Sequence, residues 1–233
     1  MSANPDVLQE PEAAESTVEE TPLPLTGVFG QTLDWNPEDF ALEQIRNLVR
    51  RVFLTGAAPQ ATQIAISAAE KETDAFELCD QVGWALALET GSDVAVVGGG
   101  ELPLGDRLRP HSRFAGRVTI KSWSTQKATN LWHVPQRGGR DRGTGRYWLS
   151  FLAELRNEFQ YSIILAPNAG KSTEAALLGQ LADGVILVLE AHRTRKATAR
   201  KIKETMLASQ CRILGTVLSE RTFPLPEWIY RRL

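Results

Sequence analysis

Cysteine, histidine and long apolar runs are all scarce in this 233-residue chain. Its two cysteines, Cys79 and Cys211, are far apart, and its three histidines, His111, His133 and His192, are equally scattered. This spacing matches no metal-ligand pattern and provides no disulfide framework, so we expect no metal site and a reduced, cytoplasmic protein. No apolar run approaches the roughly 20 residues of a membrane-spanning helix, and the chain lacks the basic start of a signal peptide. We therefore expect a soluble protein without a transmembrane segment, which reaches the inner membrane only through a partner.

Basic residues are absent from the first 45 positions, which carry ten acidic side chains. The other 188 residues hold 18 acidic and all 26 basic side chains, which gives them a net charge of +8. Residues 1–27 are also rich in Pro, Glu, Ala, Ser and Thr and poor in large apolar groups, a composition typical of disorder. We predict a disordered acidic tail and connector over 1–36 and a single α/β domain over 37–233.

Strand and helix patterns alternate through the rest of the chain. In 62–100, apolar runs at 64–66 and 94–97 flank a stretch with helical spacing, which predicts a right-handed βαβ unit. The apolar residues of that helix are Leu78, Val82, Ala85, Leu86 and Leu88. Further helices are predicted at 37–55, 147–159, 173–181 and 194–209, further strands at 117–123, 131–134, 161–166, 185–189 and 213–218, and a short aromatic helix at the C-terminus. The first helix is expected to bury Ala41, Ile45, Leu48, Val49 and Val52. The alternation predicts a mainly parallel sheet with helices on both faces.

The loop after the first strand of the βαβ unit, 68–75, is the part of such a unit that faces a ligand. The helix that follows offers unpaired N–H groups there, and these attract a phosphate. The loop holds no glycine, and three of its four charged residues are acidic: Glu70, Lys71, Glu72 and Asp74. A phosphate cradle needs inward-facing N–H groups and a cation. The pattern therefore predicts a nucleotide-binding scaffold whose phosphate cradle is missing.

Several segments resemble the bacterial tyrosine kinase (BY-kinase) family. They are the segment 43–49, which begins with Glu43 and contains Arg46, then QIAISAAE (63–70), NLWHVP (130–135), YSIILAP (161–167) and the block 181–218. The resemblance covers roughly residues 40–225 and implies a P-loop NTPase-like fold of the Min/Par type. It also implies a place in capsule and exopolysaccharide synthesis.

The chain departs from the family at each anchor of the nucleotide. The resemblance places the phosphate-binding lysine of the Walker A motif on Ala75 and its magnesium-binding hydroxyl on Phe76. The second acidic motif falls on Gly98 and Gly100, and the Walker B aspartate falls on Leu165. We therefore expect no catalytic residue, no bound nucleotide and no cofactor.

The family's assembly helix, Glu-x-x-Arg-x-x-Arg, is partly retained. Glu43 and Arg46 remain, while Val49 replaces the last arginine. The resemblance therefore implies an interface at Glu43 and Arg46, with a homo-oligomer as one assembly. The family's C-terminal tyrosine cluster is missing, since the three tyrosines are Tyr147, Tyr161 and Tyr230.

A rival phosphate motif lies at 169–173, Ala-Gly-Lys-Ser-Thr, which follows one predicted strand and opens a helix. The usual motif places Gly or Ala five residues before its second glycine, where this chain has Leu165. We interpret the segment as a polar loop. The alternative is a relocated site for ATP and magnesium, formed by Gly170, Lys171, Ser172 and Thr173.

Four other signals have purely structural interpretations. The glycines at 98–100 do not form a dinucleotide fingerprint, because position 103 is proline and no helix opens there. The arginine-glycine loop, 137–146, is interpreted as a solvated connector. The basic helix at 194–209 is interpreted as a solvated face, with docking to an acidic partner or an anionic membrane surface as the alternative. Trp228 and Tyr230 are expected to form a packed cap.

These observations predict a catalytically degenerate, BY-kinase-like pseudo-ATPase with a regulatory or scaffolding role in exopolysaccharide or capsule biosynthesis and export. The resemblance implies a membrane polysaccharide co-polymerase, or an active kinase relative, as its partner. We expect no DNA partner. One alternative is an active tyrosine kinase or ATPase that uses the relocated site near Lys171, and another is an adaptor that binds a polyanion.

Overall fold

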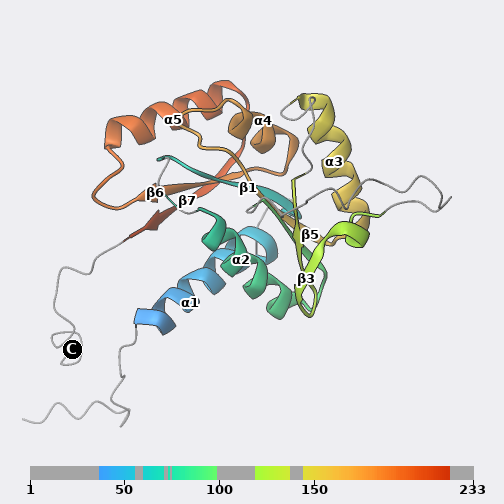
Figure 1. Ribbon diagram of the computed structural model, residues 1–233. Coiled ribbons are helices and arrows are strands. Elements are labelled where there is room, and N and C mark those ends of the chain that lie inside the picture. Colours follow the sequence, from blue (N-terminus) through green and yellow to red (C-terminus); the bar gives the residue numbers. More distant parts are fainter. Residues whose placement is uncertain are drawn as a thin grey trace, which may run out of the picture. The chain divides into compact units, whose positions relative to one another are not determined.

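The computed structural model describes residues 37–55, 60–70, 73, 75–98, 119–136 and 144–220 (Figure 1). All of them belong to the compact unit that runs from Trp35 to Leu233, while Met1–Asp34 lies outside the described part. The predictions for the tail, for 137–143 and for the C-terminal aromatic helix therefore concern residues that are not described. The predicted domain boundary at 36 stays a prediction.

The described elements follow the predicted alternation. The helices are α1 (Pro37–Val49), the π-helical turn η1 (Arg50–Leu54), α2 (Ala75–Thr90), the 3-10 turn η2 (Lys121–Trp123), α3 (Gly145–Glu158), α4 (Glu174–Leu181) and α5 (Lys196–Ala208). The strands are β1 (Gln63–Ala68), β2 (Val94–Val97), β3 (Thr125–Ala128), β4 (Leu131–Val134), β5 (Tyr161–Leu165), β6 (Val185–Glu190) and β7 (Ile213–Ser219). They form one sheet in the order β3-β4-β2-β5-β1-β6-β7, in which only the β3–β4 pair is antiparallel. The predicted, mainly parallel sheet is confirmed.

Helices cover both faces of this sheet (Figure 1). On one face α1, η1 and α2 pack against Ile64, Ile66 and Val96, and on the other α3, α4 and α5 pack against Ala65 and Ile164. Successive residues of a strand point to opposite faces, so a strand covered on both sides reads as a continuous apolar run. All six residues of β1 are buried, and the predicted two-faced arrangement is confirmed.

The strand predicted at 117–123 is wrong for the described residues 119–123. Lys121–Trp123 forms a 3-10 turn instead, because the Glu158 carboxylate accepts hydrogen bonds from the N–H groups of Ile120 and Lys121, at 2.7 and 2.9 Å. The strand lies further along, at Thr125–Ala128, and turns through Asn130 (φ 65°) into β4. Asn tolerates this left-handed conformation, which explains the tight hairpin.

Two residues predicted to be buried are exposed. Ala41 is exposed, like the other residues from 39 to 44, and Ile45 is the first half-buried residue after them in α1. Leu88 is 62 % exposed although Leu86 is fully buried. Two positions along a helix differ by about 200°, so these two side chains leave α2 on opposite sides. The described remainder of both apolar stripes is buried or half-buried, as predicted.

Candidate functional site

The carboxyl ends of the parallel strands meet at one edge of the sheet, where ligands bind in open α/β folds. Here β2, β5, β1 and β6 lie side by side, and they end at Val97, Leu165, Ala68 and Glu190. The loop between β1 and α2 closes this edge, and Ala69, Glu70 and Thr73 are its described residues. The other charged positions of the loop, 71, 72 and 74, lie outside the described residues.

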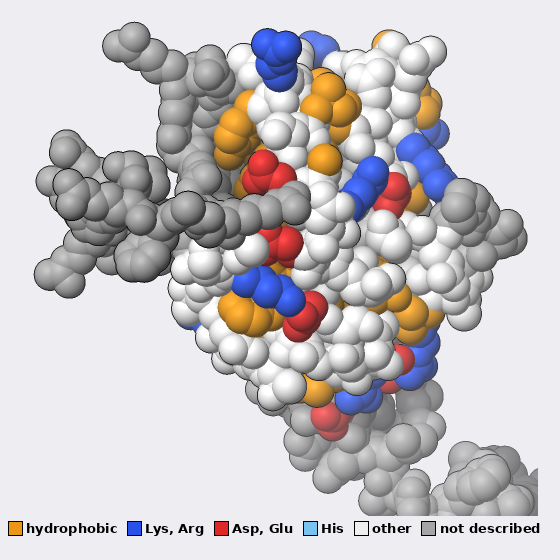
Figure 2. All heavy atoms as spheres, turned by 90° about the vertical axis from the view of Figure 1, so that its right-hand side faces the viewer, with side chains coloured by type: hydrophobic (Ala, Val, Ile, Leu, Met, Phe, Trp, Pro, Cys, Tyr) orange, Lys and Arg blue, Asp and Glu red, His pale blue; other side chains and the backbone are white. Residues whose placement is uncertain are grey.

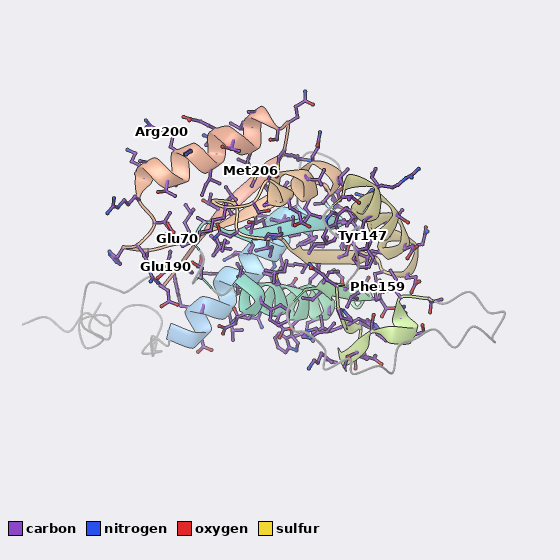
Figure 3. The ribbon with its side chains drawn as sticks, turned by 45° about the horizontal axis from the view of Figure 1, so that its top comes forward. Glu70, Tyr147, Phe159, Glu190, Arg200 and Met206 are labelled. Carbon is purple, nitrogen blue, oxygen red and sulfur yellow. The ribbon has the colours of Figure 1, made fainter. Side chains whose placement is uncertain are left out.

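Hydrogen bonds tie the β1–α2 loop to the neighbouring elements. The Ala69 N–H donates to the Val188 carbonyl of β6 at 2.9 Å, and the Thr73 hydroxyl donates to Glu190 Oε2 at 3.1 Å. Figure 3 shows Glu70 and Glu190 at the same end of the sheet. Arg193 Nη1 lies 3.1 Å from Glu190 Oε1, so this arginine is already held by a carboxylate. The edge therefore carries carboxylates where a triphosphate would need cations.

At the two positions where the resemblance places Walker A residues, Ala75 lies in the core and the partly buried Phe76 packs against it. Ala75, the first residue of α2, is 5 % exposed. Phe76 packs edge-on against the His133 ring, with 5.6 Å between the ring centres. His133 in turn pairs through Nε2 with Asp80 Oδ1 at 2.5 Å. A methyl group and a phenyl ring supply neither a cation nor a metal ligand.

Gly98 and Leu165 meet where the resemblance places two aspartates. Gly98 has φ +117°, a conformation that L side chains rarely adopt, and a Cβ built there would lie 2.5 Å from the Leu165 Cβ. The Gly98 N–H donates to the Val134 carbonyl at 3.2 Å, which fixes the backbone in this position. The sheet edge is therefore built around a glycine and a leucine, without room for a carboxylate at position 98. Gly100, the other predicted position, lies outside the described residues.

The rival motif forms a turn whose N–H groups are bonded within the turn. The Gly170 N–H donates to Asn168 Oδ1 at 2.9 Å, and those of Lys171 and Ser172 donate to the Asn168 carbonyl at 3.1 and 2.9 Å. The Glu174 N–H donates to the Ser172 hydroxyl at 3.1 Å. Gly170, Lys171 and Thr173 are exposed and Ser172 is half-buried, so the structure brings the four predicted residues together on the surface.

A carboxylate already lies at the start of α4. Glu174 is its first residue and accepts a hydrogen bond from Trp148 Nε1 at 2.8 Å. A helix N-terminus favours a negative charge, and here the chain supplies its own. The turn before α4 nevertheless touches the carboxyl end of β1, since the Ala169 N–H donates to the Ala68 carbonyl at 2.9 Å. The relocated site would therefore lie at the same edge of the sheet as the β1–α2 loop, where the phosphate cradle was expected to be missing.

The described residues of this edge do not fit a magnesium–triphosphate complex. Magnesium needs oxygen ligands in near-octahedral geometry, and the phosphates need N–H groups and cations that face them. No group of three or more His, Cys, Asp and Glu side chains with the geometry of a metal site occurs in the described part of the chain. Nor does any helix there have the length and apolarity needed to cross a membrane.

The predicted interface residues lie together on the outer side of α1. Arg46 Nη1 is 3.8 Å from Glu43 Oε2, and each side chain is about half exposed. Arg50 extends this group, because its guanidinium lies 3.9 Å from Glu43 and 2.9 Å from Glu89 of α2. Val49, where the resemblance places the family's last arginine, is fully buried and therefore packs in the core.

An apolar groove of about 390 Å³ between α1 and α2 adjoins this charged group. Leu42 and Trp84, each 45 % exposed, and Leu88 line it together with Ile45. Large exposed apolar groups in one place often mark an interaction surface. The sequence prediction missed this groove. A signal existed, since Gln81, Trp84 and Leu88 follow one another at helical spacing on the outer side of α2.

A polar cluster at 93, 121 and 132 anchors η2. Lys121 Nζ lies 2.5 Å from Asp93 Oδ2, and Trp132 Nε1 donates to Asp93 Oδ1 at 3.3 Å. The hydrogen bond from Lys121 holds the pKa of Asp93 below its ordinary value. Lys121 also lies over the Phe159 ring, 5.2 Å from its centre. The cluster explains the placement of η2 and involves none of the predicted site residues.

Comparison with curated proteins gives short matches to kinases. No family model matches the chain. It is 34 % identical over 74 residues to the tyrosine-protein kinase CpsD of Streptococcus agalactiae serotype III (strain NEM316), a match that covers 32 % of each chain. A CpsD of Streptococcus agalactiae is 32 % identical over 74 residues. The chain thus spans about a third of the length of the curated relatives that it matches.

Comparison with solved structures gives longer matches at lower identity. The kinase domain of Escherichia coli tyrosine kinase ETK has a TM-score of 0.61 and 12 % identity, with 80 % of this chain and 79 % of that chain covered. The chimerical protein CapA2B2 has a TM-score of 0.58 and 18 % identity, with 76 % and 83 % covered. The cell division protein MinD of Aquifex aeolicus has a TM-score of 0.51 and 18 % identity, with 68 % and 69 % covered. The predicted P-loop NTPase-like fold is confirmed.

Proposed function

We propose that this chain is a catalytically degenerate member of the BY-kinase and P-loop ATPase family. The sequence match to a tyrosine-protein kinase and the fold matches to tyrosine kinase domains support this proposal. The contact between Gly98 and Leu165 carries the proposal. Two positions where the family holds magnesium through carboxylates are packed against each other, without space for an added side-chain atom at position 98. The protein is a pseudo-ATPase, and its role is regulatory or scaffolding.

The loss of nucleotide chemistry follows from what replaces the anchors. Phosphoryl transfer depends almost entirely on positioning and on cations that stabilise the developing charge. Removing one such stabilising group typically lowers a rate by about 10²–10³-fold. Here Ala75, Phe76 and Leu165 replace three groups at once, and Glu190 faces the same edge. An enzyme altered in this way retains no useful turnover.

The proposed pathway is exopolysaccharide or capsule biosynthesis and export, with a cytoplasmic location. The proposed partner is a membrane polysaccharide co-polymerase or an active kinase relative, which would also hold the chain at the inner membrane. The charged group Glu43, Arg46 and Arg50 and the adjoining groove with Trp84 form the surface that supports such a partner, or a second copy of the chain.

The direct test uses the purified full chain, free of any other kinase. We expect no phosphate release from ATP with magnesium, no tyrosine phosphorylation and no rise in melting temperature at millimolar nucleotide. Binding at 100 times the dissociation constant would add about 2.7 kcal/mol of stability, an effect that a melting curve resolves. An active BY-kinase domain is the positive control. Phosphotyrosine on the isolated protein would refute the proposal.

The second candidate is an active nucleotide site near Lys171. The hydrogen bond between the Ala169 N–H, in the turn that contains Lys171, and the Ala68 carbonyl at the end of β1 supports it, because nucleotides bind at this edge of the sheet in open α/β folds. ATP, ADP and inorganic phosphate are titrated into wild type and Lys171→Ala, with and without magnesium. Tight binding that is lost only in the variant supports this candidate. Equally weak, salt-sensitive binding in both supports the pseudo-ATPase.

A further inference from the structure

Helix α5 has one buried side and one broad exposed side. Ile202 and Met206, 4 % and 1 % exposed, pack into the core between α5 and the sheet. Figure 3 shows Met206 directed toward the sheet and Arg200 directed away from it. Burial of the two apolar residues fixes the rotation of the helix about its axis. The side chains on its outer side are therefore presented in a fixed arrangement.

Five basic side chains at the start and along the outer side of α5 are exposed. They are Arg195, Lys196, Arg200, Lys201 and Lys203, and the one acidic residue among 195–208 is Glu204. None of the five lies within ion-pair distance of a carboxylate among the described residues. On the face shown in Figure 2, by contrast, acidic and basic side chains are interspersed. The outer side of α5 therefore carries five basic side chains and one acidic side chain, a net charge of +4.

Three of these cations and one leucine form a line along the helix. Lys196, Arg200, Lys203 and Leu207 are separated by four, three and four residues, the spacing of neighbours on one helix face. Leu207 is 54 % exposed. A leucine in register with cations suits a membrane surface, because such a surface offers phosphates and apolar chains within a few ångströms of each other.

We propose that the outer side of α5 binds the surface of an anionic lipid bilayer directly. Lys196, Arg200 and Lys203 contact the lipid phosphates, and Leu207 enters the layer beneath them. Long Lys and Arg side chains suit this position, since their stems lie in apolar surroundings while their charged ends reach the headgroups. This binding goes beyond the proposed function and does not depend on whether the chain hydrolyses ATP.

The geometry favours a membrane over a nucleic acid. The exposed positions of α5 carry Lys, Arg, Ala, Glu, Thr and Leu, and none carries an aromatic ring or a side-chain amide. Proteins that read or stack on bases rely on those groups. Helix α5 also lies on the face of the sheet opposite α1 and α2, so a membrane beneath α5 leaves the groove at Trp84 open to a protein partner (Figure 1).

The test is co-sedimentation of the full chain with vesicles of phosphatidylcholine alone or with 30 % phosphatidylglycerol. Each basic residue near such a surface strengthens binding about fivefold, so reversing two of them weakens it by at least about 25-fold. The test variant is Arg200→Glu with Lys203→Glu. Its matched control is Arg51→Glu with Lys127→Glu, the same change of charge at exposed positions of η1 and β3.

We expect binding to the anionic vesicles only, with loss in the α5 variant and little change in the control. Leu207→Ser should weaken vesicle binding several-fold while leaving binding to duplex DNA unchanged. Wild-type binding should also fall as salt rises from 0.05 to 0.5 M, a readout that needs no variant. The proposal is overturned if both double variants lose binding equally, or if neutral vesicles bind as well. The face would instead be assigned to nucleic acid if the chain binds duplex DNA more tightly than vesicles and if Leu207→Ser leaves both affinities unchanged.

Discussion

Replacing Gly98 with alanine should destabilise the chain strongly, because the site combines two separate costs. The first is conformational: φ is +117° at Gly98, and left-handed backbone costs an L residue about 1–2 kcal/mol. The second is steric, since the new Cβ would lie 2.5 Å from the Leu165 Cβ. Overpacking of this kind costs about 1–3 kcal/mol. We expect a loss of about 2–5 kcal/mol, or roughly 5–15 °C in melting temperature for a domain of this size.

A matched glycine separates the two costs. Gly91 also has a positive φ, +63°, but a Cβ there would meet nothing within 4 Å. Gly91→Ala therefore measures the conformational cost alone, at about 1 kcal/mol. The assay is urea unfolding followed by tryptophan fluorescence and circular dichroism, with the midpoint and the slope reported for each variant.

The identity of the contact atom allows a sharper control. The nearest atom to the added Cβ is the Leu165 Cβ, which Leu165→Ala retains and Leu165→Gly removes. The cost of Gly98→Ala should therefore fall by the steric part, about 1–3 kcal/mol, in the Leu165→Gly background and change little in the Leu165→Ala background. Equal costs for Gly98→Ala and Gly91→Ala would refute the packing that supports a degenerate site.

Three further predictions concern other parts of the chain. Acidification should lower the free energy of unfolding more in wild type than in Lys121→Met, because the hydrogen bond from Lys121 lowers the pKa of Asp93 in the folded state. The stability that ionised Asp93 contributes is complete above its unfolded pKa of about 3.9 and is lost as the pH falls through the folded value. Acid unfolding curves of both proteins measure this difference. Burial raises the pKa of Cys211 to about 11, so its thiol should stay unmodified by a thiol reagent at pH 8 in the native protein and react in urea. Trp84→Ala should leave the melting temperature nearly unchanged, since the Trp84 side chain is 45 % exposed. The same variant should bind any partner that uses the groove with lower affinity.

The sequence was sufficient for the sheet because its central strands are apolar at nearly every position. Runs such as Ile64–Ile66 and Val94–Val97 need apolar cover on both faces, and helices supply it in a parallel sheet. The predicted family and fold are both supported by the matches to known proteins. The strand at 117–123 was predicted wrongly because alternation is a weak signal when a distant carboxylate, here that of Glu158, holds the backbone in another form.

The candidate site was predictable in part, and the limit was spatial. The resemblance to the family pointed to Ala75, Gly98 and Leu165 as positions without its anchors. It could not reveal that Gly98 and Leu165 touch, because β2 and β5 are brought together by a sheet order that differs from the chain order. The groove at Trp84 was missed for the same reason, since α1 and α2 meet only in the fold.

If the proposed function holds, the chain keeps its fold without the family's anchors because the core and the sheet edge are built from different residues. Ile64, Ile66 and Ile163 supply burial in the middle of the sheet, whereas Gly98 and Leu165 occupy the ends of their strands. Loss of a cation or a carboxylate at the edge removes an electrostatic cost and leaves the core untouched. A chain that loses nucleotide chemistry in this way still presents its helical surfaces unchanged. The groove between α1 and α2 and the basic side of α5 are such surfaces, and they lie on opposite faces of one sheet. The proposed protein partner and the proposed membrane contact would therefore not compete for one face.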